Sequence, residues 1–144
     1  MKDCIFCKIV SGEMPIYKVY EDNDYLAFLA VPSLNPGHTL VIPKKHIRWV
    51  WDLSIGRKSS PNLGTYYEII GKVAKAIRKS LKTEWLVSLI VGEEVPHAHV
   101  WLVPRFDNDG HGGSLDLKNV KKLTDQEMKR QAEKIKKALS NYEK

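Results

Sequence analysis

The sequence predicts an α+β domain built on an antiparallel sheet of about five strands, with one long central helix and a C-terminal helix. Three observations lead to this prediction. Short runs rich in β-branched and aromatic residues precede any long helical pattern. Two later segments repeat apolar residues at helical spacing. The resulting order of strands, helix, strands and helix is typical of the α+β class.

The first half of the chain predicts three strands. Residues 16–30 contain two β-rich runs around the turn sequence Glu-Asp-Asn-Asp, which indicates a hairpin. Pro36 and Gly37 give the next turn signal, and the aliphatic run at 38–43 indicates a strand near the centre of the sheet. Residues 54–64 are rich in Ser, Gly and Pro, so we expect a flexible loop there.

The second half predicts two helices and two strands. A helix is expected from Asn62, because apolar residues recur at helical spacing at Leu63, Tyr66, Tyr67, Ile70, Val73, Ala74, Ile77 and Leu81. Residues 85–91 and 97–103 indicate two strands, and 107–114 a loop. Thr124 and Glu127 have capping-box spacing before a final amphipathic helix marked by Met128, Ala132, Ile135, Leu139 and Tyr142.

Length and charge limit the class of protein. A chain of 144 residues fits one domain, residues 1–144, in which 116–144 form a basic C-terminal helical extension. The net charge is +6, and 116–144 carry nine Lys/Arg against five Asp/Glu, or +4. Because the two signs are interspersed and no stacking aromatics lie among them, a solvated helix face is favoured over nucleic-acid binding.

The chain shows no signal for a membrane. No apolar run approaches the roughly 18 residues of a membrane span, and no secretory signal precedes Cys4. We therefore expect a soluble cytoplasmic protein that has no membrane partner.

The segment Val-Pro-His-Ala-His-Val-Trp at 95–101 places polar and aromatic residues at every second position. In a strand, His97, His99 and Trp101 share one face, whereas Ala98, Val100 and Leu102 share the other. Two imidazoles and an indole would then line one surface. His99 could act as a nucleophile, because a neutral imidazole can attack phosphorus. A core histidine satisfied by hydrogen bonds is the alternative.

Cys4 and Cys7 form a Cys-x-x-Cys pair near the N-terminus. A thioredoxin-type site is disfavoured because no βαβ unit surrounds the pair, and a disulfide is disfavoured without a secretory signal. Zinc is the best functional interpretation, with free buried cysteines as the alternative. The histidines that could complete a site are His38, His46, His97, His99 and His111, of which His111 is expected to be merely solvated in a glycine-rich loop.

Taken together, these segments resemble the histidine triad (HIT) superfamily of nucleotide hydrolases and transferases, most closely its Hint-like branch. The resemblance covers nearly the whole chain and rests on residues 4–9, 12–15, 19–22, 26–28, 36–46 (PGHTLVIPKKH) and 97–105 (HAHVWLVPR). It implies an α+β sheet with a long helix, usually assembled as a homodimer.

The resemblance also implies roles for individual residues. The middle histidine of the triad, here His99, would form a nucleotidyl-imidazole intermediate. A structural zinc ion would be held by Cys4, Cys7, His46 and His97. His38 would face the active site, and a purine nucleotide would pack against Ile5, Phe6, Ile9, Met14, Phe28 and Leu29, all of them apolar.

The chain departs from the family pattern on the phosphate and ribose side. Trp101 replaces the third triad histidine; its indole can donate one hydrogen bond but cannot shuttle a proton, and we expect it to wall the substrate pocket. Ala30 replaces the acid that usually holds the ribose. The asparagine usual in the preceding strand has no counterpart in 88–91, and the loop with phosphate donors is shortened to 92–96.

The resemblance predicts an enzyme that cleaves at the α-phosphate of a nucleoside phosphoramidate or dinucleoside polyphosphate. The branch of galactose-1-phosphate uridylyltransferases also lacks the third histidine and still uses the middle one. The alternative is a zinc-stabilised nucleotide-binding or regulatory module with little or no catalysis. A protein that binds nucleic acid through its basic final helix is a third possibility.

Overall fold

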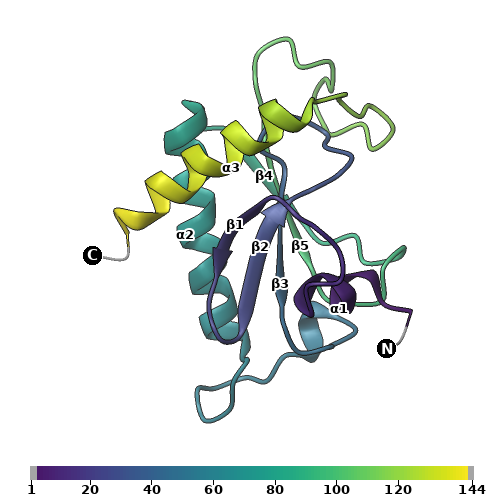
Figure 1. Cartoon of the computed structure of the whole chain (residues 1–144), viewed down its shortest axis with the longest axis vertical. Coiled ribbons are helices and arrows are strands. Elements are labelled where there is room, and N and C mark those ends of the chain that lie inside the picture. Colours follow the sequence, from purple (N-terminus) through teal and green to yellow (C-terminus); the bar gives the residue numbers. More distant parts are fainter. Residues whose placement is uncertain (1–2, 143–144) are drawn as a thin grey trace.

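Five strands form one antiparallel sheet in the order β1-β2-β3-β5-β4 (Figure 1). The computed structural model describes residues 3 to 142. The strands are β1 (Lys18–Glu21), β2 (Tyr25–Leu29), β3 (Thr39–Pro43), β4 (Leu86–Leu89) and β5 (Val100–Pro104). The helices are α1 (Ile5–Val10), α2 (Leu63–Leu81) and α3 (Asp125–Ser140), with a short 3-10 turn η1 (Val50–Asp52). The predicted α+β class and five-stranded sheet are confirmed.

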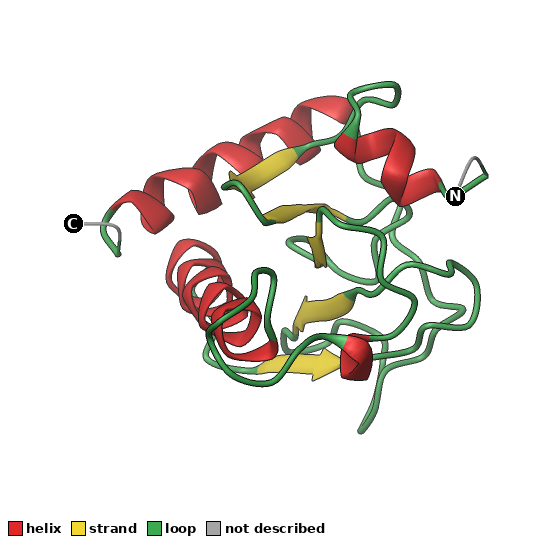
Figure 2. Cartoon of the chain, turned by 90° about the horizontal axis from the view of Figure 1, so that it is seen from below, coloured by secondary structure: helices red, strands yellow, loops and turns green. Residues whose placement is uncertain are grey.

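Helices cover both faces of the sheet (Figure 2). The helices α2 and α3 pack on one face, where Ala27 and Leu29 of β2 join a large core cluster. The short helix α1 covers the other face, where Leu26 and Phe28 belong to a second, smaller cluster with Phe6. Successive residues of β2 therefore enter different cores, which explains why the whole strand is apolar.

The long helix α2 begins where the sequence predicts. The side chain of Asn62 accepts a hydrogen bond from the Thr65 N–H and caps the helix. Tyr66 is completely buried, and its hydroxyl donates to the carbonyl of Val41 at 2.6 Å, which ties α2 to β3. Tyr67, predicted on the apolar face, is instead 38% exposed. Adjacent residues of a helix point in directions about 100° apart, so only one of the two tyrosines can face the sheet.

The C-terminal helix α3 packs on α2 and β1. Thr124 and Glu127 form the predicted capping box, and the buried side chains include Met128, Ala132, Ile135 and Leu139. Tyr142 was predicted on this apolar stripe, but it lies beyond the end of the helix and is 39% exposed. The apolar stripe of α3 therefore packs on the rest of the domain, and the lysines lie on the opposite side of the helix.

The structure differs from the sequence-based predictions in three places. Helix α1 was not predicted, because six residues are too few to show a helical period. Strand β5 starts at Val100 rather than at residue 97, so His97 and His99 lie in the segment before it. The expected loop at 54–64 ends before Leu63, where α2 begins, and the Leu63 N–H donates to the carbonyl of Ser54 at 2.8 Å.

The alternation of the predicted strand nevertheless persists before β5. The N–H of Ala98 donates to the carbonyl of Ile47 at 2.7 Å, and both side chains belong to the α2 face. Between residues 3 and 142, no helix combines the length and apolar character needed to cross a bilayer.

Substitution of Ile135 tests how strongly α3 contributes to the fold. Ile135 lies on α3 and is fully buried in the large core cluster. We expect Ile135→Ala to lower the free energy of unfolding by about 2–5 kcal/mol, through lost burial and the cavity left behind. Lys134→Ala changes the preceding, exposed residue and should alter the free energy of unfolding by less than about 0.5 kcal/mol. Urea denaturation compares the two variants, and equal effects would contradict the packing of α3.

Candidate active site and metal-binding cluster

Four side chains converge beside α1 from three separate segments of the chain. The ligand atoms of Cys4, Cys7, His46 and His97 all lie within 4.8 Å of one another. The Nδ1 atom of His97 lies 3.4 Å from Cys4 Sγ and 3.6 Å from Cys7 Sγ, and His46 Nδ1 lies 3.2 Å from Cys7 Sγ. Two thiols and two imidazoles in this arrangement form a set that can bind a metal.

Hydrogen bonding orients His97 for a metal ligand. Its Nε2 lies 2.8 Å from the carbonyl oxygen of Pro43, which can only accept, so Nε2 carries the proton. The unprotonated Nδ1 therefore faces the two sulfur atoms. Tetrahedral bonds of about 2.3 Å to sulfur and 2.0–2.1 Å to nitrogen separate ligand atoms by roughly 3.3–3.8 Å. The observed separations are near this range, and the residues fit such an ion.

The thiols are poorly suited to stand alone as charged groups. Burial, and next the hydrogen bond with Cys4, raise the pKa of the Cys7 thiol to about 11. Cys4 is itself buried. A bound cation reverses this preference, because it stabilises thiolates strongly.

His99 lies next to this cluster with a free ring nitrogen. Its Nδ1 lies 2.7 Å from the carbonyl oxygen of His97, so Nδ1 donates and Nε2 holds a lone pair. No side chain or backbone group of residues 3–142 hydrogen-bonds this Nε2. Burial lowers the pKa of His99, the hydrogen bond to His97 opposes that shift, and the charge of Arg48 lowers the pKa further. A neutral imidazole whose lone pair is not hydrogen-bonded is a competent nucleophile.

Among residues 3–142, the side chains of His38 and Trp101 each have a buried hydrogen-bond donor without an acceptor. His38 Nδ1 accepts from the Leu34 N–H at 3.0 Å, so its proton is on Nε2. Within the described residues, neither His38 Nε2 nor Trp101 Nε1 has a partner, and both atoms are buried. The two rings lie with centroids 5.1 Å apart. An unsatisfied buried donor costs about 1–3 kcal/mol, so this pair favours a ligand that brings an acceptor.

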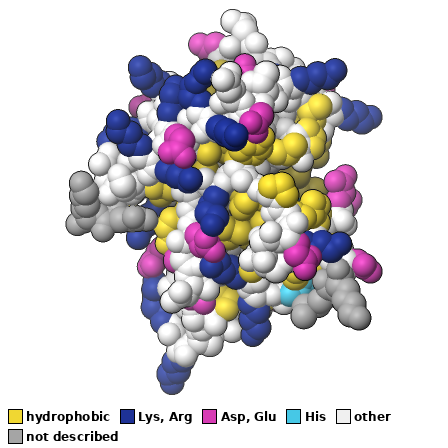
Figure 3. Space-filling view, in the orientation of Figure 1, with side chains coloured by type: hydrophobic (Ala, Val, Ile, Leu, Met, Phe, Trp, Pro, Cys, Tyr) yellow, Lys and Arg dark blue, Asp and Glu magenta, His cyan; other side chains and the backbone are white. Residues whose placement is uncertain are grey.

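An apolar groove of about 830 Å³ opens between α1, β2 and α3. Figure 3 shows hydrophobic side chains gathered over this part of the surface, with charged side chains around them. The six residues predicted for a nucleobase all line it: Ile5, Phe6, Ile9, Met14, Phe28 and Leu29. Phe6 also packs edge-on against His99, with ring centroids 5.0 Å apart, so one residue of the groove wall contacts His99, which does not itself line the groove.

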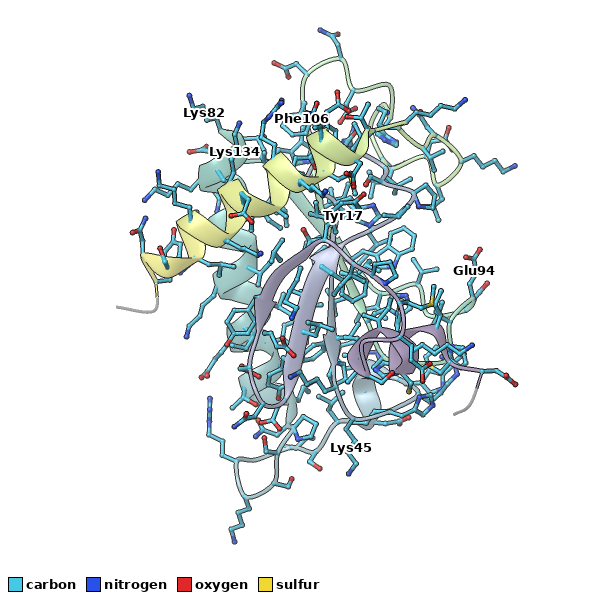
Figure 4. All side chains as sticks on the ribbon, in the orientation of Figure 1. Tyr17, Lys45, Lys82, Glu94, Phe106 and Lys134 are labelled. Carbon is cyan, nitrogen blue, oxygen red and sulfur yellow. The ribbon has the colours of Figure 1, made fainter. Side chains whose placement is uncertain are left out.

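The sequence does not indicate that α3 supplies a wall of this groove. Lys129, Ala132, Glu133 and Lys136 line it together with Asp125, whose carboxylate accepts from the Tyr17 hydroxyl at 2.6 Å. Figure 4 shows Tyr17 beneath α3. Only packing of α3 on β1 brings these residues to the groove. The contact of the Arg48 guanidinium with the Gly92 carbonyl was also not predicted.

His111 was expected to be solvated, and that prediction is wrong. The side chain is buried, its Nε2 donates to the carbonyl of Leu34 at 2.8 Å, and its Nδ1 accepts from the Asp116 N–H. The glycine-rich loop folds back over the chain, and a buried imidazole needs both nitrogens satisfied. His111 therefore has a structural role outside the metal-binding cluster.

Comparison with known proteins assigns the family. A family model described as the HIT domain matches residues 11–108. An uncharacterised HIT-like protein of Borreliella burgdorferi is 41% identical over 116 residues, covering 78% of this chain and 82% of the relative. The chain belongs to the HIT family of nucleotide-binding hydrolases and transferases.

Further similarities concern activity and metal. Adenylylsulfatase HINT3 of Arabidopsis thaliana is 29% identical over 131 residues, covering 87% of this chain and 64% of the relative. The crystal structure of a histidine triad nucleotide-binding protein of Sulfolobus tokodaii aligns with a TM-score of 0.80 at 26% identity, covering 97% and 94% of the two chains. That of a Zn-bound family protein of Mycobacterium smegmatis aligns at 0.76 with 27% identity, covering 99% and 96%.

Removal of both thiols tests the metal-binding cluster. We expect the purified protein to hold about one tetrahedral metal ion per chain, and Cys4→Ser/Cys7→Ser to lose it, because hydroxyls replace two thiolate ligands. Elemental analysis of freshly purified protein measures the stoichiometry. Ser11→Ala, exposed at the end of the same helix, should keep the ion. Full metal content in the double variant would contradict the assignment.

The stability of the protein should depend on the protonation of His38. Burial lowers the pKa of His38 to about 4, from about 6.5 in the unfolded chain. Below pH 6.5 the unfolded chain therefore binds more protons, so stability is lost as the pH falls from 6.5 to 4. Between pH 7 and pH 5 this loss is about 2 kcal/mol. Urea unfolding at pH 7 and pH 5 should show a smaller loss of unfolding free energy in His38→Gln than in the unmodified protein. Equal losses in the two proteins would show that His38 is not responsible.

Proposed function

We propose that this protein is a Hint-like enzyme that cleaves nucleotide conjugates at the α-phosphorus through a nucleotidyl-His99 intermediate. Its substrate would be a purine nucleoside phosphoramidate or a dinucleoside polyphosphate. The observation that carries the proposal is the free Nε2 of His99, whose ring packs against Phe6 in the wall of an apolar groove. Family membership supports nucleotide chemistry, and the Arabidopsis relative bears the name of an activity on a nucleotide conjugate.

The reaction would take place in two displacements at phosphorus. The lone pair of His99 Nε2 forms a bond to the α-phosphorus as the bond from phosphorus to the leaving nitrogen or oxygen breaks. Water then forms a bond to phosphorus, the bond to Nε2 breaks, and the water proton is released with the nucleotide. The hydrogen bond from Nδ1 to the carbonyl of His97 keeps the lone pair on Nε2 throughout the approach.

The groove and the unpaired donors would divide recognition of the nucleotide. The apolar walls suit the faces of a purine base, which would lie against Phe6 and Ile9. His38 Nε2–H and Trp101 Nε1–H would face acceptor atoms on the phosphate side, where each new hydrogen bond recovers the cost of an unsatisfied donor. Trp101 cannot carry a proton, so the leaving group would take its proton from solvent or from another group.

The cluster of Cys4, Cys7, His46 and His97 would hold a structural zinc ion. Four protein ligands fill a tetrahedral ion, so its contribution would be to brace this edge of the sheet. The orientation of His97 would also govern His99, because the carbonyl of His97 fixes the His99 ring. The Zn-bound relative of known structure supports the choice of zinc. Reduced thiol ligands suit a cytoplasmic location.

A homodimer is part of the same proposal. Strand β4 is at the edge of the sheet, and the exposed Trp85 precedes its half-buried residues Leu86, Val87 and Leu89. An open edge of this kind can pair with a second chain. The regulatory or binding module without catalysis is the second candidate, and Trp101 at the third triad position favours it.

Substitution of the nucleophile separates these two candidates. We expect His99→Gln to reduce turnover of adenosine 5′-phosphoramidate by at least about 10³-fold, because no other group can form the intermediate. Binding of AMP should change by less than about threefold, since the groove is intact. Glu93→Gln, an exposed loop variant, should retain activity. Product release and calorimetry measure the two effects.

Two results would decide against parts of this proposal. Turnover unaffected by His99→Gln would refute the nucleophile. Tight binding of AMP by the unmodified protein without any turnover would favour the binding module.

A further inference from the structure

Arg48 follows Ile47, whose carbonyl accepts a hydrogen bond from the residue before His99, and its guanidinium forms no ion pair among residues 3–142. We propose that Arg48 binds the α-phosphate of the nucleotide held at His99, in place of the donors that are missing from the shortened loop 92–96. This inference rests on the proposed function and names the residue that recognises the charged part of the substrate.

The backbone brings Arg48 close to the segment that carries His99. The carbonyl of Ile47 accepts from the Ala98 N–H at 2.7 Å, and both of these side chains enter the α2 core. Their neighbours His46 and His97 also meet, with ring centroids 5.1 Å apart. Residues 48 and 99 each directly follow a partner of this backbone hydrogen bond, so the chain brings Arg48 next to the segment that carries His99.

Two contacts hold the guanidinium in place. One of its nitrogens, NH1, donates to the carbonyl of Gly92 at 2.9 Å. Its central carbon lies 3.7 Å from the centroid of the Trp49 ring. Gly92 has φ of +74°, and a Cβ there would come within 2.8 Å of the same indole. Arg48, Trp49 and Gly92 therefore form a tight assembly that costs the arginine little further ordering when a ligand binds.

The charge of Arg48 remains available to a ligand. Glu93 and Glu94 in the adjacent loop are exposed, and Figure 4 shows Glu94 directed away from the body of the molecule. The positive charge of Arg48 also lowers the pKa of His99. Of the five N–H donors of a guanidinium, one is used by Gly92, which leaves a planar fork for an anion.

The chemistry of a phosphate matches this fork. A guanidinium can donate two parallel hydrogen bonds to phosphate oxygens and oppose the charge that develops on them in the transition state. Loop 92–96 has no side chain that is a neutral or cationic donor. Arg48 would thus hold the phosphorus within reach of His99 Nε2, while the apolar groove holds the base.

The experiment compares AMP with adenosine, which differ only in the phosphate. Calorimetry on the full-length, metal-containing protein measures both affinities in the unmodified chain, Arg48→Gln, Arg48→Lys and Lys45→Gln. We expect Arg48→Gln to weaken AMP binding by roughly 10- to 100-fold, the loss typical of a hydrogen-bonded charge, and adenosine binding by less than about twofold. Glutamine is shorter than arginine and gives up the contact with the Gly92 carbonyl, so unchanged adenosine binding serves as the check that the loop is intact.

The other variants distinguish the planar fork from charge alone. Arg48→Lys should lose less AMP affinity than Arg48→Gln, because it keeps the charge but not the paired donors. Lys45→Gln removes an exposed cation three residues away, which Figure 4 shows pointing outward, and should change AMP binding by less than about threefold.

Each result bears on one level of the proposal. AMP affinity unchanged by Arg48→Gln, or equal losses of AMP and adenosine affinity, would overturn the role of Arg48 and leave the nucleotide site standing. Selective loss of AMP affinity in a protein without turnover would support Arg48 and count against the enzyme. Absence of binding to either ligand by the unmodified chain would overturn both proposals.

Discussion

The arrangement of the site depends on His97, which joins the metal-binding cluster to the nucleophile. Its Nε2 donates to Pro43 of β3, its Nδ1 faces two sulfurs, and its backbone carbonyl orients His99. These contacts hold His97 in place in the segment before β5, where the chain is outside the hydrogen-bonded ladder of the sheet. A metal bound by the cluster would therefore stabilise the tautomer and direction of the neighbouring imidazole without touching the substrate.

The difference in size between the two cores leaves an apolar groove next to this site. The α2 and α3 face is a continuous apolar core, whereas the α1 face is smaller and leaves a groove toward α3. Phe6 belongs to the small core and contacts His99 as well, so the same ring forms part of the groove wall and supports the nucleophile. In the proposed function, the apolar groove would hold the base, and the unpaired donors of His38 and Trp101 would face the phosphate.

Much of the fold could be predicted from periodicity alone. Helix α2 and the capping box of α3 start at the predicted residues, because their signals lie within one or two turns of chain. The predictions failed where distant contacts decide the outcome. Six residues of α1 are too few to show a period. His111 is buried because a loop folds back onto Leu34, and a local count of glycines cannot indicate such a contact.

By itself, the sequence determined the family, the order of the elements and the chemical types available to the site, because these depend on residues close together in the chain. The tertiary structure decided which groups meet. It showed that α3 lines the groove, that the proton of His99 is on Nδ1, and that Arg48 is held against Gly92 and Trp49. Each of these facts depends on distances between segments separated by dozens of residues, and a pattern along the chain contains no such distances.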